Sequence, residues 1–193
     1  MKIPHTFITT FSGQRFDFTK FEPDTVRITD IAHSLAHLCR YNGHTQKFYS
    51  VAEHSCLIHD WVLQEYGSDH NPDHRSTIQQ HARTALFHDA AEAYVGDMVK
   101  PLKPQFPDYH EYSLRLQQEI CYVLRIGWPF PDIVKEADRR IQRDEIEKFW
   151  PQGTARTFDF KALGVLIEGW GPRVAEMEFI YRARQVMSPD APW

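Results

Sequence analysis

The stretch Thr-Ala-Leu-Phe-His-Asp-Ala-Ala-Glu-Ala-Tyr-Val-Gly-Asp, residues 84–97, decides how the rest of the chain is interpreted. It is rich in alanine and free of proline, and it predicts the end of a helix over 76–94. His88 and Asp89 are adjacent, so on a helix they point about 100° apart and can reach one point from two sides. Glu92 follows His88 by four residues and shares its face. One imidazole with two carboxylates suits a divalent metal and an acid–base group, although the dipeptide alone is common on solvated helix faces.

The composition is that of one globular domain. The chain has 193 residues, of which 42% are hydrophobic and 25% charged, with a net charge of −4. It contains no run of Lys or Arg, which disfavours a nucleic-acid polymer as partner, and no apolar run near the ~18 residues that a membrane span needs. Three scattered cysteines favour reduced thiols and a cytoplasmic location. Eleven histidines raise the expectation of a bound metal.

The chain outside this stretch predicts a small hairpin and a series of helices. Residues 6–19 alternate aromatic and polar side chains around Ser12-Gly13, and Phe16 and Phe18 are expected to pack this hairpin onto helices. Helices are expected over 31–40, 51–66, 76–94, 109–124, 131–150, 160–168 and 172–187, the last with Val174, Met177, Ile180 and Tyr181 buried and Glu176 and Glu178 solvated. Polar breaks are expected at 67–73 and 151–153. The sequence therefore predicts an all-α bundle of six or seven helices with an N-terminal β-hairpin, in a single domain over 1–193.

Two further groups of histidines lie upstream of the central stretch. Ser50 can cap the second helix and Glu53 has capping-box spacing, which places His54 in the first turn, where its side chain can project past the helix end. His33 and His37 are one turn apart on the first helix. They could bind a metal as a pair, but an ordinary helix face is the simpler interpretation.

A single acidic residue stands out downstream of the central stretch. Asp138 lies among apolar residues of the fifth helix and is expected to face inward. A buried carboxylate needs a cation or hydrogen-bond donors. A salt bridge to Arg139 or Arg140 and a bound metal are equally compatible with the spacing.

Taken together, these residues resemble a known family. His54, the pair His88-Asp89 and Asp138 follow the order H…HD…D on separate helices, within the boxes SVAEHS, LFHDAAEAYVGD and VKEAD. This pattern resembles the HD-domain metal-dependent phosphohydrolases over about 30–150, most closely the short HD 5′-deoxynucleotidases and the phage HD enzymes that remove triphosphate from dATP. The resemblance implies an HD-domain helical bundle, with the hairpin before it and a helical extension over about 154–187 after it. It also implies that His54, His88, Asp89 and Asp138 bind one divalent transition metal (Co, Mn, Zn, Ni or Fe), and it leaves a second metal open.

The resemblance implies roles for residues around these ligands. Glu92 matches a position that orients or deprotonates the attacking water or protonates the leaving oxygen. Asp97 matches a residue that contacts substrate or water, although a helix-end cap is an equal alternative. Arg40 matches a phosphate-binding arginine, and its planar guanidinium suits phosphate. Tyr41 replaces the tryptophan that packs near C2′ in the nucleotidases.

Substrate contacts and the reaction follow from the same resemblance. Lys100 could contact phosphate or be a solvated loop residue, and His54 and Asp97 are expected to face the substrate as well. The expected reaction converts a deoxynucleoside 5′-monophosphate into deoxynucleoside and phosphate. The alternative is a dNTP triphosphohydrolase that releases tripolyphosphate; a cyclic-nucleotide phosphodiesterase and a non-catalytic nucleotide-binding protein are less favoured. The expected partners are a small nucleotide and further copies of the chain, with no nucleic-acid polymer and no membrane.

Overall fold

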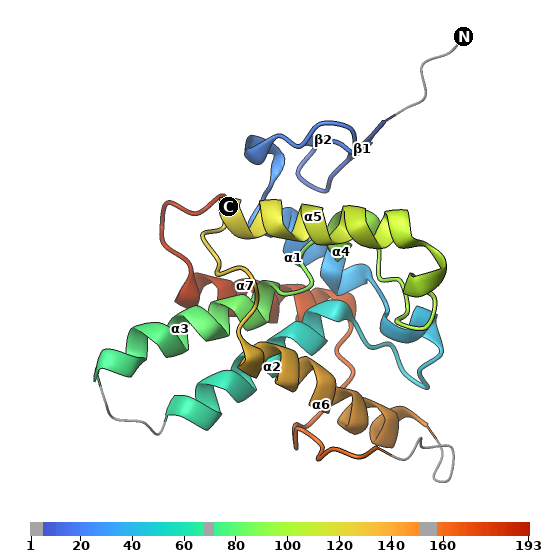
Figure 1. Cartoon of the computed structure of the whole chain (residues 1–193), viewed down its shortest axis with the longest axis vertical. Coiled ribbons are helices and arrows are strands. Elements are labelled where there is room, and N and C mark those ends of the chain that lie inside the picture. The colour runs from blue at the N-terminus through green and yellow to red at the C-terminus, as the bar shows by residue number, and fades with distance from the viewer. Residues whose placement is uncertain (1–5, 68–71, 151–157) are drawn as a thin grey trace.

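The computed structural model describes residues 6–67, 72–150 and 158–193, and it is a helical bundle with one small hairpin (Figure 1). The break expected at 151–153 and part of the loop expected at 67–73 lie outside these residues. The α-helices are α1 (Ile28–His37), α2 (Val51–Gly67), α3 (Pro72–Phe87), α4 (Glu92–Val95), α5 (Pro107–Val123), α6 (Asp132–Phe149) and α7 (Pro172–Val186). Strands β1 (Phe7–Thr9) and β2 (Arg15–Asp17) pair antiparallel, and short 3₁₀ turns are η1 (Pro23–Thr25), η2 (Arg40–Gly43) and η3 (Lys103–Gln105). These elements confirm the predicted all-α class with an N-terminal hairpin. Within the described part of the chain, every helix is too short or too polar to cross a lipid bilayer.

Helix α2 occupies the middle of the bundle, where α1, α3, α6 and α7 pack around it. Its first turns are buried on all sides, so its polar residues Glu53 and His54 need partners inside the protein. Ser50 precedes the helix, and its hydroxyl accepts a hydrogen bond from the Glu53 N–H at 3.1 Å, as the capping pattern predicts. The Glu53 carboxylate, however, points to a distant segment. Helix α2 therefore lies at the centre of the core and also carries buried polar side chains.

The hairpin is attached to the bundle as predicted. Phe16 is buried and stacks on Tyr94 of α4 at a centroid distance of 4.1 Å. The Asp30 carboxylate on α1 accepts hydrogen bonds from the hydroxyls of Thr10 and Ser12 and from the Ser12 N–H, at 2.6–2.8 Å. Two strands alone would be marginally stable, so these contacts to helices hold the hairpin in place.

The helix expected to run unbroken over 76–94 is interrupted at 88–91, so that prediction is wrong. In a continuous helix the Ala91 N–H would bond the Phe87 carbonyl. The side chain of Gln117 on α5 satisfies both groups instead: its oxygen accepts from the Ala91 N–H at 2.8 Å, and its nitrogen donates to the Phe87 carbonyl at 3.0 Å. A side chain inserted into the ladder breaks the helix axis. The break separates α3 from α4 and turns the His-Asp pair out of the helix.

The helix expected over 160–168 is absent, which corrects the predicted helical extension. Carboxylates from the core helices bind the amide groups that a helix would use. Asp144 of α6 accepts hydrogen bonds from the N–H groups of 163–165, and Glu53 of α2 accepts them from 168–170, all at 2.6–3.1 Å. The segment is therefore held extended between two helices.

The buried face of α7 also differs from the predicted stripe. Ala175, Phe179 and Ala183 are fully buried, whereas the predicted Val174, Met177 and Tyr181 are exposed. The observed stripe is rotated by about one residue, because small alanines allow the helix to approach α1 and α2 closely. The periodicity of the sequence predicts that a helix forms here, but it does not predict which of its faces is buried.

An ion pair joins α2 to α7 and predicts a pH-dependent stability. Arg182 donates to both carboxylate oxygens of Asp60 at 2.8 and 2.7 Å. Burial alone would raise the pKa of Asp60, but hydrogen bonds from His59 and Arg182 outweigh it and lower that pKa. Replacing Asp60 by asparagine should cost about 1 kcal/mol of unfolding free energy at pH 7, since the pair is partly exposed.

The pH dependence of this loss follows from the lowered pKa. The difference between wild type and Asp60→Asn should persist above the unfolded-state pKa of about 4 and disappear as the pH falls through the lower folded-state pKa. Urea denaturation at several pH values measures it, with the exposed Asp24→Asn as matched control. A pH-independent difference would contradict the electrostatic explanation.

Candidate metal centre

Three distant segments meet at one point beside the core. His54 comes from the first turn of α2, His88 from the break after α3, and Asp138 from the middle of α6. Each offers one ligand atom, and these atoms lie within 4.8 Å of one another. The Asp138 Oδ1 atom is 3.3 Å from His54 Nε2 and 4.0 Å from His88 Nε2. This cluster has the composition and spacing of a site that could hold a metal ion.

Asp89 adds a second carboxylate to the cluster. Its Oδ2 atom is 3.1 Å from His88 Nε2 and 3.8 Å from His54 Nε2. Two carboxylates thus face the same two imidazole nitrogens. A divalent cation at this point would be neutralised by them.

The tautomers of both imidazoles fit a metal. His88 Nδ1 lies 2.8 Å from the Ala85 carbonyl, which can only accept, so this nitrogen carries the proton. His54 Nδ1 lies 2.8 Å from the Glu145 carboxylate and donates in the same way. In the neutral rings the lone pairs are then on Nε2, and both Nε2 atoms are buried without a hydrogen-bond partner among the described residues. A metal between them would satisfy these otherwise costly atoms.

The charges of the cluster are mutually stabilised. Burial alone would lower the pKa of His88, but the carboxylates of Asp89 and Asp138 outweigh it and the pKa is raised. Burial alone would raise the pKa of Asp89 and Asp138, but the imidazoles outweigh it and lower both. Both carboxyl groups are therefore ionised at neutral pH, the form that binds a cation.

Glu145 organises the surroundings of the cluster. It is fully buried on α6, two turns after Asp138. Its carboxylate accepts hydrogen bonds from His54 Nδ1 at 2.8 Å, from the Tyr49 hydroxyl at 2.9 Å and from the Tyr41 hydroxyl, and it forms an ion pair with Arg40 at 3.2 Å. Burial would raise the pKa of Glu145, but Arg40 and His54 lower it to about 2. One buried carboxylate thus orients both a candidate ligand and a candidate phosphate-binding arginine.

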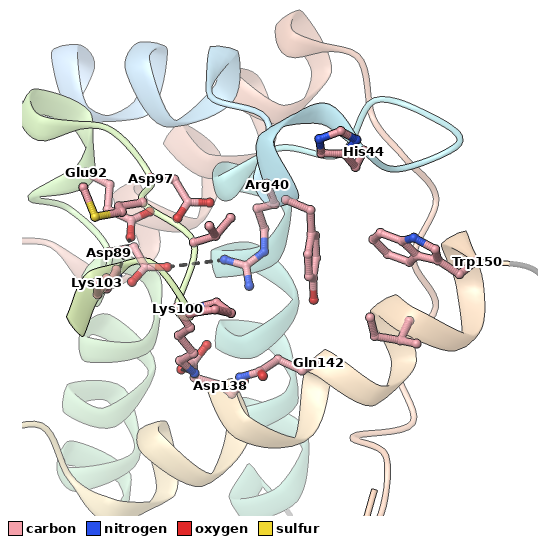
Figure 2. Close-up of a pocket in the computed structure, with 15 residues that line it drawn as sticks. Arg40, His44, Asp89, Glu92, Asp97, Lys100, Lys103, Asp138, Gln142 and Trp150 are labelled. Atoms are coloured by element: carbon pink, nitrogen blue, oxygen red, sulfur yellow. Dashed lines mark hydrogen bonds and ion pairs between the residues drawn. The ribbon is translucent and has the colours of Figure 1, made fainter. Parts of the chain in front are cut away.

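The cluster opens into a pocket of about 470 Å³ (Figure 2). Arg40, Lys100 and Lys103 bring positive charge to its wall, and Tyr41 and Trp150 contribute aromatic surface. Figure 2 shows Trp150 across the pocket from the carboxylates, with Arg40 between them. The pocket is therefore charged at one end and aromatic at the other.

The turn η2 presents two of the predicted substrate contacts. Arg40 is 3.7 Å from the Asp89 carboxylate, and the ring of Tyr41 meets that of Trp150 edge-on at 5.0 Å. Tyr41 and Asn42 both have left-handed backbones, with φ of 56° and 50°. Non-glycine residues in this region are strained, and such strain is found at binding sites.

Glu92 and Asp97, the predicted catalytic pair, both line the pocket. Burial is the main cause that raises the pKa of each, followed for Glu92 by the Asp89 carboxylate. Lys103 Nζ lies 3.6 Å from Glu92 Oε1, while Glu92 Oε2 is buried with no partner in the described residues. Asp97 is not a simple exposed cap, because its side chain faces the pocket (Figure 2).

The partners of Asp138 resolve one alternative left by the sequence. Arg139 pairs with Glu136, and Arg140 donates to backbone carbonyls near residue 162. Asp138 instead faces the two imidazoles and lies 3.3 Å from Lys100 Nζ. Lys100 is therefore at the pocket, but it neutralises a cluster carboxylate in this structure.

Comparisons with known proteins place the chain among relatives whose names state no activity. No family model matches the chain. It is 37% identical over 157 residues to the uncharacterized protein YfdR of Escherichia coli K12, covering 76% of the chain and 78% of YfdR. The chain belongs to the YfdR family. An uncharacterized protein of Rhodobacter capsulatus is 34% identical over 175 residues, or 84% of each chain.

Sequence reasoning missed Glu145 beside the cluster, and Lys103 and Trp150 among the residues that line the pocket. Glu145 could have been found, because it follows Asp138 by seven residues and so lies two turns along the same helix face. Lys103 and Trp150 carry no such signal. Both lie in or beside irregular segments whose path depends on tertiary packing.

The buried Glu145 predicts a loss of metal affinity without loss of a ligand. Glu145→Gln keeps the shape of the side chain but removes the charge that orients His54 and pairs with Arg40. We expect affinity for a divalent transition metal to fall about 10–100-fold, the range for groups that orient ligands. Isothermal titration with Co²⁺ measures it, with Glu147→Gln on the exposed face of α6 as control. Equal affinity in wild type and Glu145→Gln would remove its orienting role.

Proposed function

We propose that the protein is a metal-dependent phosphohydrolase of the HD type that converts deoxynucleoside 5′-monophosphates into deoxynucleosides and phosphate. The observation that carries the proposal is the convergence of His54, His88 and Asp138, with Asp89 beside them, on a pocket that also holds an arginine. The order of these residues in the sequence matches the HD pattern. The Nε2 atoms of His54 and His88, which have no hydrogen-bond partner among the described residues, fit a bound cation.

The metal would be one of Co, Mn, Zn, Ni or Fe, because two imidazoles and two carboxylates suit these ions. When bound, it would supply Lewis-acid stabilisation of phosphate charge and lower the pKa of a water molecule. Arg40 is placed to bind phosphate oxygens with its planar guanidinium. Its ion pair with Glu145 fixes the guanidinium before substrate arrives, which lowers the entropy cost of binding.

Glu92 is proposed to move the proton of the reaction. Burial raises its pKa, so the carboxyl group holds its proton to higher pH than an ordinary glutamate and is proposed to protonate the leaving 5′ oxygen as the P–O bond breaks. Lys103 beside it limits how far the pKa rises. Asp97 shares the same wall and is proposed to orient the attacking water.

The two ends of the pocket favour a nucleotide over a simple phosphate ester. The aromatic end, formed by Tyr41 and Trp150, offers surface for a sugar and base. Tyr41 is proposed to take the place of the tryptophan that excludes a 2′-hydroxyl. Arg40, Lys100 and Lys103 each already lie close to a carboxylate. The positive charge that remains for a ligand therefore matches one phosphate group better than a chain of three. A dNTP triphosphohydrolase is the second candidate, because Arg40, Lys100 and Lys103 place three positive charges on the pocket wall.

One substrate panel tests the proposal. Metal-free protein is supplied with Mn²⁺ or Co²⁺ and incubated with dNMPs, NMPs and dNTPs, and the products are separated by HPLC. Free deoxynucleoside from dNMPs is the expected result. Tripolyphosphate from dNTPs would favour the second candidate, equal cleavage of NMPs would remove the role of Tyr41, and no cleavage with any metal would overturn the proposal in favour of a binding protein.

A further inference from the structure

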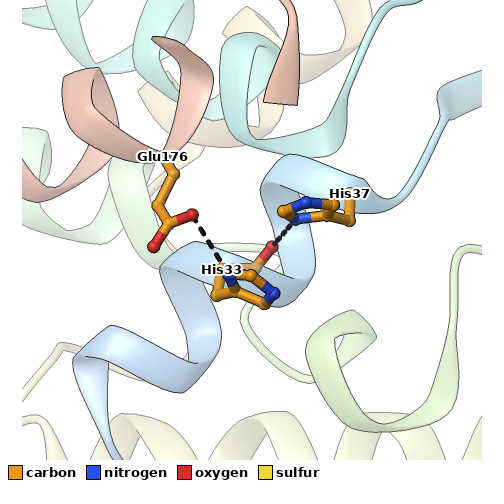
Figure 3. A group of neighbouring side chains, drawn as sticks. All are labelled: His33, His37 and Glu176. Atoms are coloured by element: carbon orange, nitrogen blue, oxygen red, sulfur yellow. Dashed lines mark hydrogen bonds and ion pairs between the residues drawn. The ribbon is translucent and has the colours of Figure 1, made fainter. Parts of the chain in front are cut away.

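A second group of ligand-type side chains lies outside the pocket, between α1 and α7 (Figure 3). His33 and His37 are one turn apart on α1, and Glu176 reaches them from α7. Each offers one ligand atom, and these atoms lie within 4.8 Å of one another. The expectation that Glu176 is simply solvated is wrong, because its carboxylate is 3.0 Å from His33 Nδ1. None of the three lines the pocket described above.

The two rings are held in a defined orientation. His37 Nδ1 is 2.8 Å from the backbone carbonyl of His33 and must donate to it, so the lone pair of the neutral His37 ring is on Nε2. The ring of His33 stacks on Phe11 at 3.8 Å and faces the His37 ring at 4.2 Å. Contacts of this kind fix ligand tautomer and direction before a metal binds.

The carboxylate of the group is not neutralised by another residue. Among residues 6–67, 72–150 and 158–193, no Lys or Arg forms an ion pair with Glu176. A cation could reach the group, since His37 is exposed and the side chains of His33 and Glu176 are 31% and 23% exposed. The site thus has two nitrogen ligands, one oxygen ligand and access from solvent.

We propose that His33, His37 and Glu176 bind a second divalent cation of the zinc class. Two imidazoles with one carboxylate suit Zn²⁺, Co²⁺ or Ni²⁺, and they disfavour Mg²⁺ and Ca²⁺, which prefer oxygen ligands. Three protein ligands leave a fourth tetrahedral position for water. The bound ion connects α1 to α7, and the Phe11–His33 stack extends that connection to the hairpin. Its role is therefore structural, and it is independent of the proposed hydrolysis.

The stoichiometry of bound zinc tests the site separately from the pocket. Full-length protein without a polyhistidine tag is freed of metal, dialysed against micromolar Zn²⁺ with excess Mg²⁺, and analysed for zinc per chain. Wild type should bind one more zinc than His37→Ala. Asp138→Ala, which disables the pocket cluster, should keep the zinc that His37→Ala loses. Equal zinc in wild type and His37→Ala would overturn the proposal, whatever the outcome for nucleotide hydrolysis.

Two further variants distinguish a specific three-ligand site from nonspecific zinc binding by an exposed histidine. His110→Ala removes an exposed histidine on α5 and should leave the stoichiometry unchanged. Glu176→Gln keeps the size of the side chain. Introduced into Asp138→Ala, in which the pocket cluster is disabled, it should remove the zinc-dependent rise in melting temperature that Asp138→Ala alone shows. A drop in bound zinc in His110→Ala equal to that in His37→Ala, or a full zinc-dependent rise in Asp138→Ala with Glu176→Gln, would contradict a three-ligand site. Circular dichroism without metal confirms that each variant folds.

Discussion

Asp138→Ala should abolish both tight metal binding at the pocket and nucleotide hydrolysis while leaving the helical bundle folded. Asp138 Oδ1 is the oxygen that lies near both His54 Nε2 and His88 Nε2, so its removal opens the cluster on the side of α6. The loss of a ligand should exceed the roughly 10–100-fold that the loss of an orienting group costs. The remaining ligands would be the two imidazoles and the Asp89 carboxylate. They come from only two of the three segments, so they cannot surround a cation on the side of α6.

Metal content and turnover must be measured on the same preparation. Asp132→Ala is the matched control, since it makes the same change on the same helix at a fully exposed side chain. All measurements are made in the His37→Ala background, so that only the pocket cluster can contribute metal. Elemental analysis, the metal-dependent shift of the melting temperature and dNMP cleavage should then all be lost on adding Asp138→Ala and kept on adding Asp132→Ala. Full metal content at the pocket in Asp138→Ala would show that the cluster is not the metal site. Retained metal with lost cleavage would assign Asp138 to the substrate.

The features that could be predicted from the sequence are those set by local pattern. The hairpin over 6–19 and the helices that became α5 and α6 follow from alternation and helical periodicity, which depend only on neighbours in the chain. The identity of the four candidate ligands followed from a motif order, and the structure brings all four together.

The features that could not be predicted depend on side chains from distant segments. Gln117 breaks the helix that local propensity extends over 76–94, and Glu53 and Asp144 hold 160–168 extended. In each case a polar side chain from a distant helix replaces backbone hydrogen bonds that the local sequence would otherwise form. The break made by Gln117 also directs His88 and Asp89 toward α2 and α6, so the local misprediction falls at the candidate site itself.

Glu92→Gln should keep the metal and lower turnover by about 10²–10⁴-fold, the range for a general acid or base. Glu92 lines the pocket but is not among the atoms that converge with His54, His88 and Asp138. Glutamine keeps its size and cannot release a proton. Metal content equal to wild type, together with the loss of turnover, would separate proton transfer from metal binding.

The pH dependence of kcat tests the role of Glu92 further, and its expected direction follows from the raised pKa of that residue. Burial and the Asp89 carboxylate raise the pKa of Glu92, so the protonated form persists to higher pH than in an ordinary glutamate. If Glu92 donates the proton, wild-type kcat should fall as pH rises through that pKa, and Glu92→Gln should lack this limb. Asp97→Asn, which alters the neighbouring carboxyl group, should keep the limb, and Glu136→Gln on the exposed face of α6 should match wild type. A kcat limb unchanged in Glu92→Gln would assign the proton to Asp97, because its pKa is raised by burial on the same wall.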